Sequence, residues 1–182
     1  VGNTATWTSS PVLVDTVAPA DAFTLTAITG GVFKSGTTLF YKGNAAGSFK
    51  LRDTVTDALS GPASATFGAL SGGAGFSTHN SETISTPAGG PYDSTAITWA
   101  GAASGAPTIP AHGTDVAGNS QADSTYTLAL DNTAPGGGVI SVPATVNALS
   151  VAITTTLATD GGSGLAAGTN TITRSNGQAV AA

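Results

Sequence analysis

Short runs in which apolar and polar side chains alternate occur along most of the chain, separated by glycine and proline. This alternation places every second side chain on one face of an extended backbone, so each run predicts a half-buried β-strand. The predicted strands cover residues 23–27, 38–41, 49–51, 63–69, 95–99 and 125–130. No stretch has the period of about 3.6 residues that an amphipathic helix needs.

The breaks between these runs carry turn residues. Glycine permits a positive φ and proline presets φ, so clusters of the two mark turns between strands. They stand at residues 30–31, 43–44, 60–62, 71–73, 89–91 and 118–119. Several short strands at this spacing predict an all-β fold, either a sandwich or a barrel.

Two segments of the chain recur in the same order. Residues 14–19 read VDTVAP and residues 130–135 read LDNTAP, an offset of 116 (131 − 15), and residues 1–19 align with 117–135 without a gap. Residues 56–61 read TDALSG and residues 159–164 read TDGGSG, an offset of 103 (159 − 56). The second copy therefore has 13 residues fewer between the two landmarks (116 − 103). This internal period predicts repeat domains.

The repeat also predicts where the domains begin and end. We expect residues 1–14 to be the terminal strand of a preceding repeat, residues 15–131 a complete domain, and residues 132–182 the first part of a second domain. An orphan strand such as 1–14 can complete the sheet of another molecule by strand addition, with Val12 and Val14 as interface candidates. The plainer interpretation is that the chain is a fragment of a longer array.

The motifs resemble those of a known family. Residues 115–120 (DVAGNS), followed by an alternating strand and then LDNTAP, resemble the end-of-domain signature of bacterial immunoglobulin-like tandem repeats. TDALSG is similar to a mid-domain turn of the same family. The resemblance covers nearly the whole chain and implies immunoglobulin-like antiparallel β-sandwich repeats, as found in stalks, adhesins and surface filaments. One departure is Pro110, where the family commonly has a tyrosine-rich strand; lacking an N–H, it predicts an edge or bulged strand.

Charge is scarce and unevenly placed. Charged residues are 8% of the chain, against about 25% in ordinary soluble domains, which indicates a surface packed in an assembly or covered by glycan. The net charge of −5 argues against nucleic acid as a partner, because phosphates require clustered cations. No apolar run reaches the roughly 18 residues of a membrane span. No Asn-x-Ser/Thr site occurs, and the absence of cysteine leaves the redox compartment open.

Catalytic chemistry has little support in the sequence. The chain contains the residue types of a catalytic triad, namely serine, aspartate and either His79 or His112. However, the nucleophile motif Gly-x-Ser-x-Gly is absent, and residues 161–165 (GGSGL) depart from it at the last position. We expect no enzyme and no resident cofactor, and His79 in its polar loop should be solvated.

Metal binding is the more credible chemistry. Asp15 and Asp131 mark the junctions between repeats, and Asp57 offers a further carboxylate, so these three are calcium candidates. Calcium takes 6–8 oxygen ligands, usually from several carboxylates, and the acidic residue nearest to Asp131 is Asp123. The competing interpretation, which we favour for Asp57 and Asp160, is that each carboxylate accepts backbone N–H groups within its own turn.

Two further groups of residues are candidates for binding. Four of the five cations are Lys34, Lys42, Lys50 and Arg52. They form either a solvated face or a patch that meets an acidic face of a neighbouring subunit, where opposite charges fix register. Trp99 and Tyr92 form either a sugar-stacking face or part of the core, and for Trp99 we expect the core.

These observations lead to three functional hypotheses. The first is an extracellular or cell-surface structural protein whose repeats pack into a filament, sheath or surface layer through self-association. The second is an adhesin stalk in which the repeats are spacers and the tip binds a cell-surface or glycan ligand. The third is a carbohydrate-binding accessory module of a secreted enzyme, which requires an exposed row of aromatic side chains.

Overall fold

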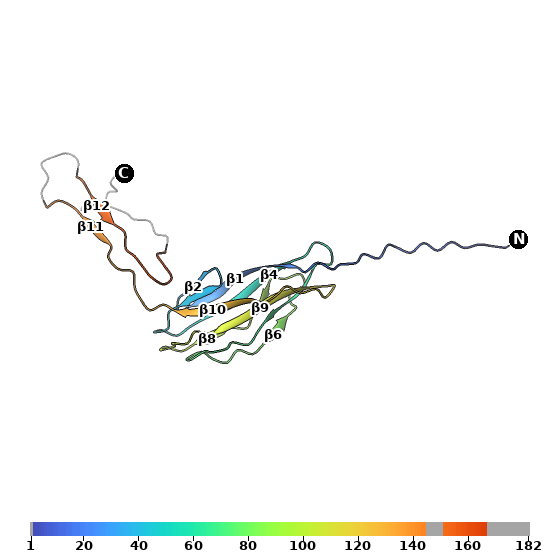
Figure 1. The fold of residues 1–182 in the computed structure, drawn as a ribbon, viewed down its shortest axis with the longest axis horizontal. Helices are drawn as coiled ribbons and strands as arrows, with labels where there is room; N and C mark the ends of the chain where they lie inside the picture. Colours follow the sequence, from blue (N-terminus) through green and yellow to red (C-terminus); the bar gives the residue numbers. More distant parts are fainter. Residues whose placement is uncertain (1, 145–150, 167–182) are drawn as a thin grey trace. The chain divides into compact units, whose positions relative to one another are not determined.

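The computed structural model describes residues 2–144 and 151–166, which belong to two compact units that divide between Asn132 and Thr133 (Figure 1). The described residues contain strands and irregular segments and no helix, so the predicted all-β class is confirmed. It follows that none of them lies in a helix of the length and apolarity needed to cross a membrane.

Two sheets make up the first unit. One has the order β1-β4-β7 with β8 also paired to β4, and the other has the order β2-β3-β10-β9-β5-β6. All neighbouring strands are antiparallel except β10 and β3, which run parallel. The strands are β1 Ala20–Thr29, β2 Val32–Ser35, β3 Thr38–Tyr41, β4 Gly47–Thr56, β5 Pro62–Phe67, β6 Glu82–Ile84, β7 Tyr92–Asp93, β8 Ile97–Trp99, β9 Thr108–Asp115 and β10 Ser124–Leu130.

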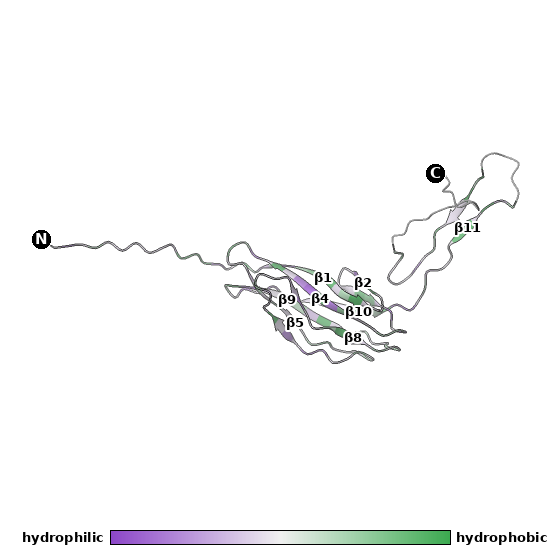
Figure 2. Ribbon diagram, turned by 180° about the vertical axis from the view of Figure 1, so that it is seen from behind, coloured by the Kyte–Doolittle hydropathy of each residue, from purple (hydrophilic) through white to green (hydrophobic). Residues whose placement is uncertain are grey.

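The two sheets share one hydrophobic core. Every second residue of β4 is buried from Phe49 to Val55, and β9 alternates in the same way from Ile109 to Asp115. Figure 2 shows hydrophilic and hydrophobic positions following each other along the strands. Because successive side chains of a strand point to opposite faces, the polar residues between the buried ones face outward. Each of the six predicted runs overlaps a strand, and β2, β6, β7 and β9 are additional.

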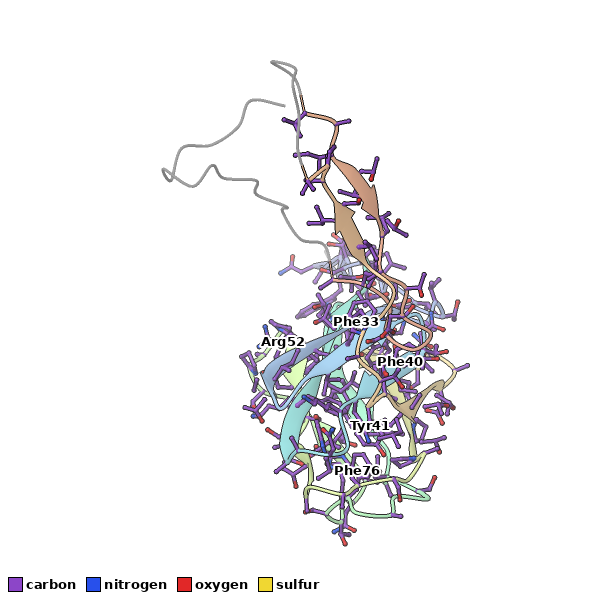
Figure 3. All side chains as sticks on the ribbon, turned by 90° about the vertical axis from the view of Figure 1, so that its left-hand side faces the viewer. Phe33, Phe40, Tyr41, Arg52 and Phe76 are labelled. Carbon is purple, nitrogen blue, oxygen red and sulfur yellow. The ribbon has the colours of Figure 1, made fainter. Side chains whose placement is uncertain are left out.

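Aromatic side chains gather at one end of this core. The ring centroids of Tyr41 and Phe76 lie 5.0 Å apart and edge to face, and the two side chains can be followed in Figure 3. Trp99 is 3% exposed and donates its Nε1–H to the carbonyl oxygens of Lys42 and Ala45. The prediction that Trp99 belongs to the core is confirmed. Since Tyr92 is also buried, neither ring offers a face for sugar stacking.

One sequence prediction about the sheet is wrong. Pro110 is predicted to lie in an edge or bulged strand, but β9 lies between β10 and β5 in the six-stranded sheet, and the register shift in the β5–β9 pairing falls between Pro62 and Ser64 of β5, away from Pro110. Pro110 is tolerated because the pairing with β5 ends at Phe67, opposite Ala111. Its own carbonyl oxygen accepts the N–H of Gly68, 2.7 Å away. The missing N–H therefore falls just past the paired part of β5.

The second unit contains one antiparallel strand pair, β11 Val139–Ser141 with β12 Thr154–Thr156, among its described residues. Val139 pairs with Thr156 and Ser141 with Thr154, and Gly136 bridges to Thr159. Subtracting 116 from the first residue number of each pair and 103 from the second gives the register of β1 with β4. There Phe23 pairs with Asp53, Leu25 with Leu51, and Ala20 with Thr56.

Candidate metal-binding site at the start of the first domain

Three carboxylate groups meet beside the segment that leads into β1. One oxygen from each of Asp15, Asp57 and Asp115 lies within 4.8 Å of the other two. Asp15 and Asp57 were metal candidates in the sequence, and the structure brings them together although 42 positions separate them (57 − 15). Asp115 was missed, although its motif with Asn119 had been recognised.

Asp57 holds its own turn together. Its Oδ1 accepts the backbone N–H groups of Leu59, Ser60 and Gly61 at 3.0, 2.7 and 2.9 Å. The Gly61 N–H, followed by the others, lowers the pKa of the Asp57 carboxyl from its ordinary value of 3.8. The expected local turn around Asp57 is therefore present, and Asp160 repeats it by accepting the N–H groups of Gly162 and Gly164.

Asp115 is fixed by the turn that follows β9. It is 2% exposed, and its Oδ1 accepts the backbone N–H of Asn119 at 2.8 Å. Its Oδ2 accepts the side-chain Nδ2–H of the same asparagine, also at 2.8 Å. The turn of residues 115–119 thus supplies a buried carboxylate with two donors, which offset part of its desolvation cost.

Asp15 joins the two turns from the entering chain. Its Oδ2 accepts the Ser60 N–H at 3.2 Å, and its backbone carbonyl accepts the Nδ2–H of Asn119 at 3.3 Å. Its Oδ1 accepts the N–H of Val17 at 3.0 Å. The segment that enters the domain is therefore attached to both loops before β1 begins.

The donor set matches calcium in kind. The three carboxylates supply hard oxygen donors, and calcium takes 6–8 of these. The same carboxylates already accept N–H groups, so the protein alone does not complete a calcium shell, and water would have to supply the remaining ligands. Asp131 is not part of this group; its backbone N–H donates to the Tyr41 carbonyl oxygen at 2.8 Å.

The four cations do not form one cluster. Lys34 belongs to β2, and its Nζ lies 5.7 Å from the centre of the Tyr126 ring. Lys50 and Arg52 belong to β4 in the other sheet, and Lys42 is exposed just after β3. Arg52 (labelled in Figure 3) donates to both carboxylate oxygens of Asp93, at 2.6 and 2.8 Å.

The exposed valines lie in the entering segment. Val12 and Val14 are 88% and 76% exposed, and residues 2–19 contain no strand (Figure 1).

The two histidines do not form a triad with a described serine. His79 was expected to be solvated, but it is 4% exposed, and burial lowers its pKa below the ordinary value of 6.5. Its Nδ1 lies 3.3 Å from Thr95 Oγ1 and its Nε2 lies 3.7 Å from Glu82 Oε1. His112 Nδ1 lies 2.6 Å from Asp123 Oδ1. The His79 side chain is therefore withdrawn from water and faces Thr95, 16 positions ahead in the chain.

Comparison with known proteins found no matching family model, no similar curated protein and no similar solved structure.

Proposed function

We propose that this chain is part of an extracellular structural protein built from tandem immunoglobulin-like domains. The domains join end to end and pack into a filament, sheath or surface layer. The observation that carries this proposal is the attachment of Asp15 to the loops around Ser60 and Asn119. Asp15 stands in VDTVAP, whose counterpart LDNTAP stands at the end of the complete domain.

The strand order supports an immunoglobulin-like assignment. In that fold, the first, second and fifth strands share a sheet that faces the third, sixth and seventh strands. Here β1, β4, β7 and β8 share one sheet, and β5, β9 and β10 lie in the other. The sheet partners of these six strands agree if β7 and β8 together are taken as the fifth strand and β2, β3 and β6 as additions, which leaves the fourth strand of the common fold without a counterpart among the described strands.

Two correspondences support a repeated domain. The β11–β12 register equals the β1–β4 register at the offsets that the sequence motifs gave. Asp57 and Asp160 accept N–H groups from the residues two and four positions ahead in both turns. Two pairs of motifs that were aligned from the sequence alone thus have the same strand pairing and the same turn.

The entering segment suits end-to-end joining. At the offset of 116, residues 8–14 correspond to β10, which pairs with both β3 and β9. Val12 then takes the place of buried Leu128, and Val14 that of Leu130. We infer that residues 8–14 form the last strand of another domain, either the preceding repeat or a neighbouring molecule. The scarcity of surface charge supports close packing of such domains.

Electron microscopy of the native material, with the mass of its depolymerised subunit, tests this function. Ordered filaments or sheets with a subunit near 17.5 kDa are expected for self-assembly through residues 8–14. If ordered filaments consist of a heavier subunit, residues 8–14 pair with a preceding repeat of the same chain, and the structural function still holds. Isolated beads on a string, without lateral order, contradict an assembly and favour the adhesin stalk. The carbohydrate-binding hypothesis loses support because Trp99 and Tyr92 are buried.

A further inference from the structure

Asp53 carries a buried carboxyl group on the inner face of the four-stranded sheet, and half-buried Asp21 points its Oδ1 into the same interior. In the antiparallel pairing of β1 with β4, Asp21 lies opposite Val55 and Phe23 lies opposite Asp53. Opposed side chains point to the same side, so the two carboxyl groups are diagonal neighbours on one face. That face contacts β9, where a Cβ at Gly113 would overlap both Asp21 Oδ1 and the Val55 methyl groups.

Each carboxyl group has one satisfied oxygen and one buried oxygen without a partner. Asp21 Oδ2 accepts the Gly113 N–H at 2.9 Å, and Asp53 Oδ1 accepts the Ala22 N–H at 3.2 Å. Asp21 Oδ1 and Asp53 Oδ2 have no hydrogen-bond partner, and Asp53 is 0% exposed. An ionised carboxylate can only accept, so two ionised groups could not satisfy each other.

We propose that Asp21 and Asp53 form a buried proton-binding site, in which one proton is shared between the unpartnered oxygens of the two carboxyl groups. The bound proton turns one carboxylate into an O–H donor for the other and removes one of two like charges from the core.

Other charged groups around the pair do not replace the proton. On β9, His112 attracts both carboxylates, but its Nδ1 is hydrogen-bonded to Asp123 Oδ1 at 2.6 Å. On β10, burial and then the charges of Asp53 and Asp21 raise the pKa of Tyr126 to about 12, so the phenol stays neutral. From β2, Lys34 lies over that ring instead of beside a carboxylate.

The direction of the titration follows from this environment. Burial, and then the charge of Asp21, raises the pKa of Asp53 from 3.8 to about 7. Burial also raises the pKa of Asp21. Between pH 3.8, the ordinary pKa of an aspartate, and about pH 7, the folded domain holds a proton that the unfolded chain releases. The stability that this proton contributes is therefore fully present below about pH 4 and falls as the pH rises toward 7, by about tenfold in the folding constant per pH unit at most.

Titration of the intact chain by carboxyl ¹³C NMR tests the site directly. The expected result is one aspartate carboxyl with a midpoint near pH 7 that disappears in Asp53→Asn. The proposal is overturned if every aspartate of the wild-type chain titrates below pH 5. This measurement needs no variant to fold, because the wild-type spectrum alone contains the decisive resonance.

Urea unfolding between pH 5 and 8 gives an independent test. Asp53→Asn and Asp21→Asn each leave one carboxyl beside an amide donor, so their stability relative to wild type should increase as the pH rises. The lowered pKa of His79 makes stability rise with pH in wild type and variants alike. Comparing each variant with wild type cancels this contribution. Asp93→Asn is the matched control, because Arg52 lowers the pKa of Asp93 below this range. Equal slopes in wild type and both Asp-pair variants would overturn the proposal.

Discussion

Asn119 donates its side-chain Nδ2–H to the backbone carbonyl of Asp15, which lies 104 positions earlier in the chain, at 3.3 Å. The same nitrogen donates to Asp115 Oδ2 at 2.8 Å. One amide group thus connects the entering segment to the end of β9. The contact explains why the asparagine of the DVAGNS motif is suited to a domain boundary, since a shorter side chain could not reach both acceptors.

Asn119→Ala should loosen the entering segment as well as destabilise the first unit. The substitution leaves Asp115 Oδ2 buried without its donor, which costs about 1–3 kcal/mol of unfolding free energy. Urea unfolding measures that loss, and limited proteolysis reports cleavage within residues 2–19. The exposed Asn80→Ala is the control. Faster cleavage in both variants, or in neither, would show that the Asn119 contact does not hold the segment.

Asp57→Ala should lower the melting temperature of the first unit and change its response to acid. The hydrogen bonds that lower the Asp57 pKa contribute stability above pH 4, and this contribution disappears as the pH falls through the folded-state pKa. The variant should therefore lose less stability than wild type between pH 4 and pH 2. Near-ultraviolet circular dichroism follows this unit, because both tryptophans and all three tyrosines lie within it.

Asp160→Ala is the matched control for that experiment. It removes the corresponding turn bonds from the second unit and should leave the aromatic signal of the first unit unchanged. If Asp57→Ala and wild type lose stability in parallel below pH 4, the Asp57 turn is not the origin of the acid sensitivity.

The carboxylate cluster predicts a response to calcium. Asp15, Asp57 and Asp115 bring three carboxylates within 4.8 Å, and a divalent cation would offset their repulsion. Calcium at 100 times its dissociation constant stabilises a binding protein by about 2.7 kcal/mol. We expect calcium to raise the melting temperature of the wild-type chain and not that of Asp115→Asn, with magnesium as the ionic-strength control. The same melting temperature in calcium and in chelator would show that the cluster binds no calcium and is only a hydrogen-bonded junction.

Sequence reasoning found the features that depend on neighbouring residues. The Asp57 turn could be predicted because its donors lie two to four positions ahead, and the strand around Phe67 because its side chains alternate locally. The position of Trp99 in the core followed from its size. In each case the physical cause lies within a few residues of the observed structure.

Features that depend on distant partners could not be read in this way. His79 is buried beside Thr95, which lies 16 positions ahead in the chain. Asp53 occupies a buried position of β4, although its sequence neighbours give no sign that an acidic residue would point inward. Asp115 was missed as a cluster member because its nearest carboxylates come from positions 15 and 57. These placements follow from the pairing of strands, which periodicity does not specify.

Ala102 has an unfavourable backbone conformation, with φ at +72° and the side chain exposed. A left-handed conformation costs a residue with a Cβ about 1–2 kcal/mol, and glycine avoids this cost. Ala102→Gly should therefore stabilise the first unit by about 0.5–1 kcal/mol, because greater freedom in the unfolded chain offsets part of the gain. Ala100→Gly, two positions earlier and also exposed, lacks the positive φ and should destabilise the unit. Urea unfolding of both variants measures the two signs, and a loss of stability in Ala102→Gly would contradict the strain at this turn.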